Sequence, residues 1–130
     1  MAKLAAQSKL VKLSAAKQKQ IVAKVRAICL ALPDTTERLS HGEPTFFVKK
    51  RSFLNMDSYH HDSPHFAAWV ASPLGAQDTL VRSDPEHFFV PPYVGYRGWV
   101  GVILDGDPDW DQVAQVIQDG HALVAAGKKR

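Results

Sequence analysis

The hydrophobic period of this chain changes twice along its length, and that order limits the possible fold more than any other feature. From Ser14 to Leu32, apolar residues recur every three or four positions, as they do on one side of an amphipathic helix. Between Glu37 and Val70 the pattern becomes short runs of aromatic and branched residues, which are typical of antiparallel strands. A helical period then returns near the C-terminus. This order predicts an α+β domain in which an N-terminal and a C-terminal helix pack on an antiparallel sheet.

The sequence also predicts where the elements lie. Strands are expected at Arg38–Ser40, Thr45–Lys49, Ser52–Tyr59, His65–Ala71 and Gly98–Leu104. The last of these is a continuous apolar run, which favours a strand covered on both faces. Short helices are expected at Pro73–Val81 and Asp84–Glu86.

Both terminal helices carry an expected buried stripe. In the first, the stripe is Ile21, Val25, Ile28 and Leu32, and Pro33 ends the helix. Asp107 is predicted to cap the second, with Pro108 at its first position. The stripe of this second helix is Trp110, Val113, Ala114, Ile117, His121 and Val124.

Length and composition indicate one domain without disulfides. The 130 residues are 45% hydrophobic, enough for a single core. Cys29, the single cysteine, lies in an apolar run and is predicted to be a small buried hydrophobe. We expect a basic N-terminal arm or helix extension at 1–13, one domain at 14–127 and a basic tail at 128–130. Because no apolar stretch is typical of a signal peptide or a membrane span, a cytoplasmic location is predicted.

Charge is divided unevenly between the ends and the body of the chain. Residues 1–33 carry seven basic and no acidic residues, and 128–130 add three more basic ones. The body carries six basic against thirteen acidic residues. Its one basic cluster is Lys49, Lys50 and Arg51, between two expected strands. With Arg97 and the basic termini, this hairpin could contact phosphates; the alternative is an ordinary solvated turn.

Several segments resemble the MmcQ/YjbR family. The first is the run from His41 to Val48, which is followed by a hairpin and Phe53. Three further segments agree, in the order that the family shows: Phe88–Tyr93, Gly98–Asp105 and Trp110–Val124. The resemblance covers about residues 18–125. The resemblance implies a frataxin-like, or double-wing, α+β fold and the DNA binding with which the family is labelled. One departure is Tyr96-Arg97-Gly98, where the family tends to carry Asn-Lys or similar.

A possible ligand cleft forms the alternative to DNA binding. Polar and aromatic residues flank glycines and prolines at His41, Glu43, Tyr93, Tyr96, Arg97 and Trp99. If they converge, the chain is a module that binds a small molecule or a protein. Alternatively, Trp99 and Tyr93 fill the core or its rim, and His41 caps a turn.

Metal and catalytic sites are not predicted. Adjacent His60 and His61 would point to opposite sides of a strand, so a solvated connection is favoured over a metal site made with Asp62 and His65. His121 is expected to be a hydrogen-bonded, partly buried histidine. Since no catalytic template fits, we expect no enzyme and no cofactor, although a hydrolase or transferase in the cleft stays open. The leading hypothesis is a non-catalytic DNA-binding domain.

Overall fold

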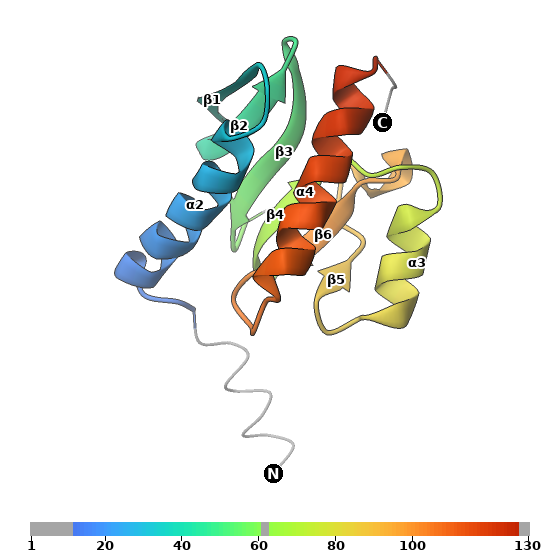
Figure 1. Ribbon diagram of the computed structural model, residues 1–130. Coiled ribbons are helices and arrows are strands. Elements are labelled where there is room, and N and C mark those ends of the chain that lie inside the picture. The colour runs from blue at the N-terminus through green and yellow to red at the C-terminus, as the bar shows by residue number, and fades with distance from the viewer. Residues whose placement is uncertain (1–11, 61–62, 128–130) are drawn as a thin grey trace.

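The computed structural model describes residues 12–60 and 63–127 and has one six-stranded antiparallel sheet with helices packed on it (Figure 1). The strand order is β1-β2-β3-β4-β6-β5. The predicted α+β class is therefore confirmed. The elements are α2 (Ala15–Leu30), β1 (Thr35–Ser40), β2 (Glu43–Val48), β3 (Arg51–Ser58), β4 (Phe66–Val70), α3 (Ala76–Ser83), β5 (Phe88–Phe89), the 3-10 turn η1 (Gly95–Arg97), β6 (Val100–Ile103) and α4 (Trp110–Ala125).

Two tight hairpins build the first half of the sheet. β1 and β2 are joined by His41 and Gly42, and β2 and β3 by Lys49 and Lys50. All four residues have positive φ, between 52° and 78°. Two-residue turns of this kind match the right-handed twist of the strands they join. Because lysine is strained in the left-handed region, the β2–β3 turn stores conformational energy.

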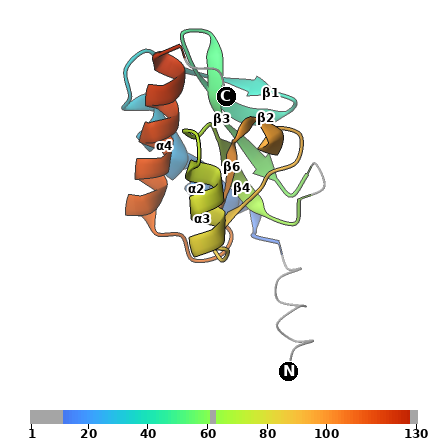
Figure 2. The same ribbon diagram turned by 90° about the vertical axis from the view of Figure 1, so that its right-hand side faces the viewer.

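Strand register separates the two faces of the sheet. Arg26 of α2 binds Glu37 of β1 at 2.7 Å, and Glu37 lies opposite Phe46, so Phe46 faces the helices. Side chains alternate along a strand, so Thr45 and Phe47 point to the opposite side. We call this side, away from α2 and α4, the open face. The loop before β6, with η1, lies on that side in Figure 2, across the strands from α4.

The core lies between the sheet and the two long helices. Val25, Cys29 and Ile117 are fully buried there, together with most side chains of β4 and β6. Both faces of β6 are covered, as its apolar run predicted. Of the expected stripe on α4, Val113, Ile117, His121 and Val124 are buried, and Val116 and Gly120 join them.

Several predicted boundaries were wrong. Helix α4 is capped by Asp109, whose carboxylate accepts from two backbone N–H groups, so Asp107 and Pro108 precede the helix. Asp84–Glu86 forms a turn instead of a short helix, and β5, which was not predicted, follows it. The carbonyl of Asp84 accepts from His87 and Phe88, which closes that turn and sends the chain back along β6.

Smaller shifts occur at other ends. Strand β1 begins at Thr35 and α2 ends at Leu30. Most of the predicted arm, the basic tail, His61 and Asp62 lie outside the described residues. Across 12–60 and 63–127, the helices are too short or too polar to cross a bilayer.

Candidate functional site

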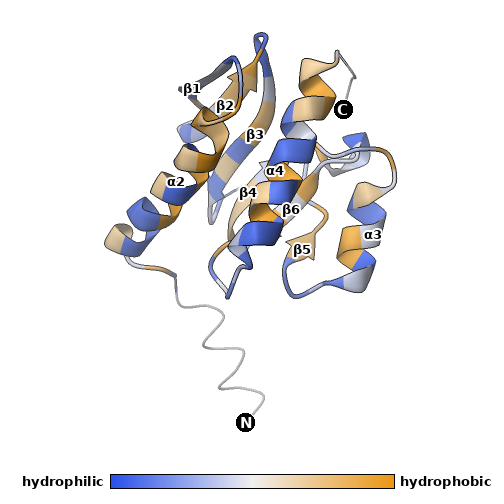
Figure 3. Cartoon of the chain, in the orientation of Figure 1, coloured by the Kyte–Doolittle hydropathy of each residue, from blue (hydrophilic) through white to orange (hydrophobic). Residues whose placement is uncertain are grey.

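The β2–β3 turn brings the only basic cluster of the body to the end of α4. Lys49 Nζ donates a hydrogen bond of 3.0 Å to the carbonyl oxygen of Ala125, the last residue of that helix. Carbonyl groups at a helix C-terminus carry partial negative charge, so a cation is favourable there. Lys50 is exposed and Arg51 half-buried. Figure 3 shows this polar turn in blue at the top, beside the C-terminal end of α4.

Arg97 lies toward the same end of the sheet, on the open-face side. Val100, which starts β6, pairs with Val70, and Val70 pairs with Leu54, near the start of β3. Two strands separate β2 from β6, and at about 4.8 Å between neighbouring strands the separation is about 14 Å. The Arg97 guanidinium lies 5.5 Å from the ring centroid of Trp99. The fold therefore places the four cations at one end of the sheet, with Lys49 on the α4 side and Arg97 on the open-face side (Figure 2) and without direct contact between Arg97 and the turn.

The lysines of α2 occupy a different region. Lys17 and Lys19 are exposed in the first turns of the helix. In Figure 1 this end of α2 lies at the bottom, far from the β2–β3 turn at the top. The first helix and the hairpin turn therefore do not form one compact basic patch.

The open face carries a cavity of about 370 Å³, which we call the open-face cavity. Three residues of the predicted cleft, His41, Glu43 and Tyr93, line it; Tyr96, Arg97 and Trp99 do not. Tyr96 is 88% exposed, and Trp99 is 2% exposed and belongs to the core. The full lining is Ser40, His41, Glu43, Thr45, Phe47, Ser52, Asn55, Met56, Trp69, Tyr93 and Val94.

Some polar side chains of this cavity remain available for a ligand. The side chains of Ser52 and Asn55 make no hydrogen bond with any residue in 12–60 or 63–127. At the edge of the cavity, the Arg38 guanidinium stacks 4.0 Å above the Phe47 ring centroid, and it has no acidic partner in the described part of the chain. Arg38 and Asn55 were not predicted as site residues, because only the register shows that they share a face with Phe47 and Trp69.

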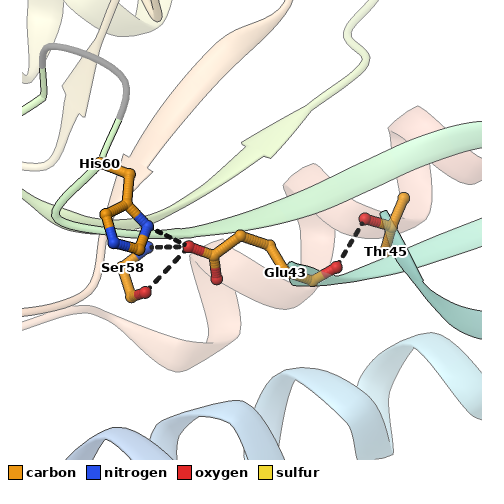
Figure 4. A network of polar contacts seen from close by, with 4 residues as sticks. All are labelled: Glu43, Thr45, Ser58 and His60. Carbon is orange, nitrogen blue, oxygen red and sulfur yellow. Dashed lines mark hydrogen bonds and ion pairs between the residues drawn. The ribbon is translucent and has the colours of Figure 1, made fainter. Parts of the chain in front are cut away.

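The buried carboxylate of Glu43 also lines this cavity, and Figure 4 shows its contacts with Ser58 and His60. Glu43 is 6% exposed, and its Oε2 accepts hydrogen bonds from Ser58 N at 2.9 Å and Ser58 Oγ at 2.8 Å. His60 Nδ1 lies 2.9 Å from the same oxygen. These contacts join the first residue of β2 to the end of β3. They also fix the orientation of the Glu43 carboxylate.

Glu43 and His60 form a potential metal-ligand group with Asp57, which is fully buried. One ligand atom from each of the three residues lies within 4.8 Å of the others. This group was not predicted, because Glu43 and Asp57 lie on neighbouring strands and are far apart in the chain. His65, from the predicted histidine loop, lies elsewhere: its Nδ1 is 3.6 Å from Asp105 Oδ1. Glu43 Oε2 already has polar contacts with Ser58 N, Ser58 Oγ and His60 Nδ1, so the orientation of this carboxylate does not require an ion.

Two further residues have structural roles, as predicted. Burial raises the pKa of Cys29 to about 12, so its thiol stays protonated. His121 Nε2 lies 2.8 Å from the carbonyl oxygen of Pro33, and its ring packs edge-on against Phe53. Neither side chain faces the open-face cavity.

Comparison with known proteins agrees with this fold. The family model of YjbR matches residues 30–123. The chain belongs to the YjbR family. Among solved structures, this YjbR domain is similar to the Deinococcus radiodurans protein DR2400, which carries a DUF419 domain; the TM-score is 0.68 at 20% identity, over 79% of this chain and 77% of that one. Curated proteins provide no match. At 20% identity the likeness to DR2400 shows the fold alone.

Proposed function

We propose that this YjbR-family domain is a non-catalytic DNA-binding domain that contacts the phosphate backbone with one end of its sheet. The contact surface, which we call the basic end, consists of Lys49, Lys50, Arg51 and Arg97. The observation that carries the proposal is the hydrogen bond from Lys49 to Ala125. It holds the basic turn beside the end of α4, from which the chain continues within three residues into Lys128, Lys129 and Arg130.

The distribution of charge supports backbone contact over sequence readout. Outside the basic end the body carries only Arg38 and Arg82 against thirteen acidic residues, so favourable interaction with a polyanion is concentrated at the basic end and the termini. Lysine and arginine contacts to phosphate release condensed counterions, which makes the affinity depend on salt. A short basic turn does not offer the several base-edge contacts that sequence-specific readout requires.

The titratable groups support a non-catalytic role. The raised pKa of Cys29 removes its thiol as a nucleophile at neutral pH. His121, the buried histidine of α4, is held by the Pro33 carbonyl instead of by a nucleophile. Glu43 is occupied by Ser58 and His60.

The test is DNA binding measured against salt concentration. Replacing Lys50 and Arg51 by alanine should weaken binding and flatten the plot of log affinity against log salt by up to about two units, since each lost phosphate contact lowers the slope by about 0.9. Removing two lysines from α2, in a Lys17→Gln/Lys19→Gln variant, serves as the matched control. An equal effect of both variants would mean that net charge, and not the basic end, governs binding.

The alternative function has weaker support. It is a module that binds a small molecule or a protein in a cleft around His41, Tyr93, Tyr96 and Trp99. Only the first two of these residues line the open-face cavity. Thermal-shift measurements with metabolites test this alternative, because a ligand that binds only the native state raises the melting temperature.

A further inference from the structure

We propose that the open-face cavity receives one unpaired base, so that the domain prefers single-stranded DNA to duplex. This inference rests on the proposed function, because the phosphates next to that base would be held by the basic end. It assigns a role to a cavity that phosphate contact alone leaves unexplained.

The cavity and the basic turn are continuous along the same two strands. Phe47 and Ser52 are cross-strand neighbours that line the cavity, and the next pair, Val48 and Arg51, closes the turn. Because side chains alternate along a strand, Val48 and Arg51 lie on the helix side, so a strand of nucleic acid with a base in the cavity would meet the cations of the turn at the tip of the hairpin.

A second cation lies on the other side of Phe47. The stacking of Arg38 on the Phe47 ring orients the guanidinium on the open face while its N–H groups have no acidic partner among the described residues. Arg38 lies opposite Thr45, which is four residues from Lys49. That is about 13 Å along the strand at roughly 3.3 Å per residue. Cations thus lie on both sides of Phe47, as a backbone with phosphates on each side of one base requires.

The cavity offers the two features that hold an unpaired base, a ring for stacking and a side chain for the base edge. Tyr93 is 62% exposed at the edge of the cavity and has a φ of 68°, a strained conformation that often marks a functional position. An aromatic ring in this position can stack on a base of any sequence. The amide of Asn55, between Thr45 and Trp69 on the open face, has a donor and an acceptor that can pair with a base edge.

The arrangement disfavours duplex DNA for a geometric reason. In a duplex, each base is stacked on its neighbours and paired at its Watson–Crick edge, so it reaches a pocket only after extrusion from the helix. A single strand presents its bases without that cost. The buried carboxylate of Glu43 lies beyond Arg38, at the far end of the cavity from the basic turn, so the phosphates belong between Arg38 and the turn.

The experiment compares the affinity of the full chain for a short oligonucleotide, for its blunt duplex and for the free mononucleotide, by fluorescence anisotropy and competition at low salt. We expect tighter binding to the single strand. Tyr93→Ala and Asn55→Ala should each weaken single-strand binding about tenfold or more and leave duplex binding unchanged, while Tyr93→Phe, which keeps the ring, should bind like the wild type. Tyr96→Ala is the matched control, since Tyr96 is 88% exposed and lies outside the cavity lining. Circular dichroism melting confirms that each variant folds.

The outcomes separate this inference from the proposed function. If Tyr93→Ala and Asn55→Ala bind both DNA forms like the wild type, while loss of Lys50 and Arg51 weakens both, the cavity inference fails and phosphate binding by the basic end stands. If the free mononucleotide binds as tightly as the oligonucleotide, the cavity is a small-molecule site and the single-strand inference is overturned. Absence of salt-dependent binding to either DNA form overturns both proposals.

Discussion

The β2–β3 turn allows stability and DNA binding to be changed in opposite directions. Lys49 and Lys50 occupy left-handed conformations, with φ of 52° and 70°. Asn-Gly is the preferred pair for such a turn. A Lys49→Asn/Lys50→Gly variant should therefore fold into the same hairpin with less strain while it loses two of the four cations of the basic end.

The expected gain in stability follows from the two residues and their one long-range contact. A left-handed conformation costs a residue with a side chain roughly 1–2 kcal/mol of stability, which the substitutions relieve. Glycine reduces this gain by about 0.5–1 kcal/mol, because it makes the unfolded chain more flexible. Loss of the Lys49 hydrogen bond to Ala125 at the helix end removes about 0.3–1 kcal/mol. The net stabilisation is about 1 kcal/mol, or roughly 4 °C in melting temperature.

Binding should change in the other direction. Two lost phosphate contacts lower the salt slope by up to about 1.8 for duplex DNA. Melting by circular dichroism and titration with labelled DNA at several salt concentrations measure both quantities on one preparation, with Lys17→Gln/Lys19→Gln as control. A less stable variant would refute the account of turn strain. A more stable variant with unchanged affinity and slope would refute phosphate contact by the turn.

Three further predictions concern other parts of the fold. The hydrogen bond to Asp84 raises the pKa of His87. The stability that protonated His87 contributes is therefore fully present below the ordinary histidine pKa near 6.5 and is lost as pH rises through the raised pKa. Between pH 5.5 and 8, the melting temperature of the wild type should therefore fall more than that of His87→Gln. Cys29, with a pKa raised to about 12 by burial, should resist a thiol reagent at pH 8 until the chain is unfolded; rapid labelling of the native protein would contradict its burial. Gly120→Ala should destabilise the domain by about 1–3 kcal/mol, because the added Cβ would overlap the backbone carbonyl oxygen of Ala71, and a higher denaturation midpoint would show that helix propensity prevails instead.

Local sequence signals predicted the class of the fold and most of its elements. The helical periods of α2 and α4 and the apolar run of β6 depend on burial patterns that repeat within one element, and such patterns are visible without the fold. The errors occurred where two residues of the same type compete, as Asp107 and Asp109 do for the cap of α4. Strand β5 was not predicted, because Phe88 and Phe89 form a strand only through their pairing with β6.

The candidate site could be predicted only in part. The cluster Lys49, Lys50 and Arg51 is contiguous, so composition and turn position reveal it. The cavity is different, because its residues come from β1–β2, β3, β4 and the loop before η1. Of the expected cleft, Trp99 went to the core and Tyr96 to solvent, since alternation along the chain does not say which neighbouring residue faces inward in a loop.

By itself, the sequence determined the α+β order, the burial of part of each helix stripe and the concentration of positive charge in one turn, because each of these depends on residues close together in the chain. Only the tertiary structure decided that this turn lies against the end of α4, that Arg38 stacks on Phe47, and that Asn55 and Tyr93 share a cavity. The physical reason is strand register: a shift by one residue would reverse the face on which every side chain lies, and register is set by pairing across the sheet.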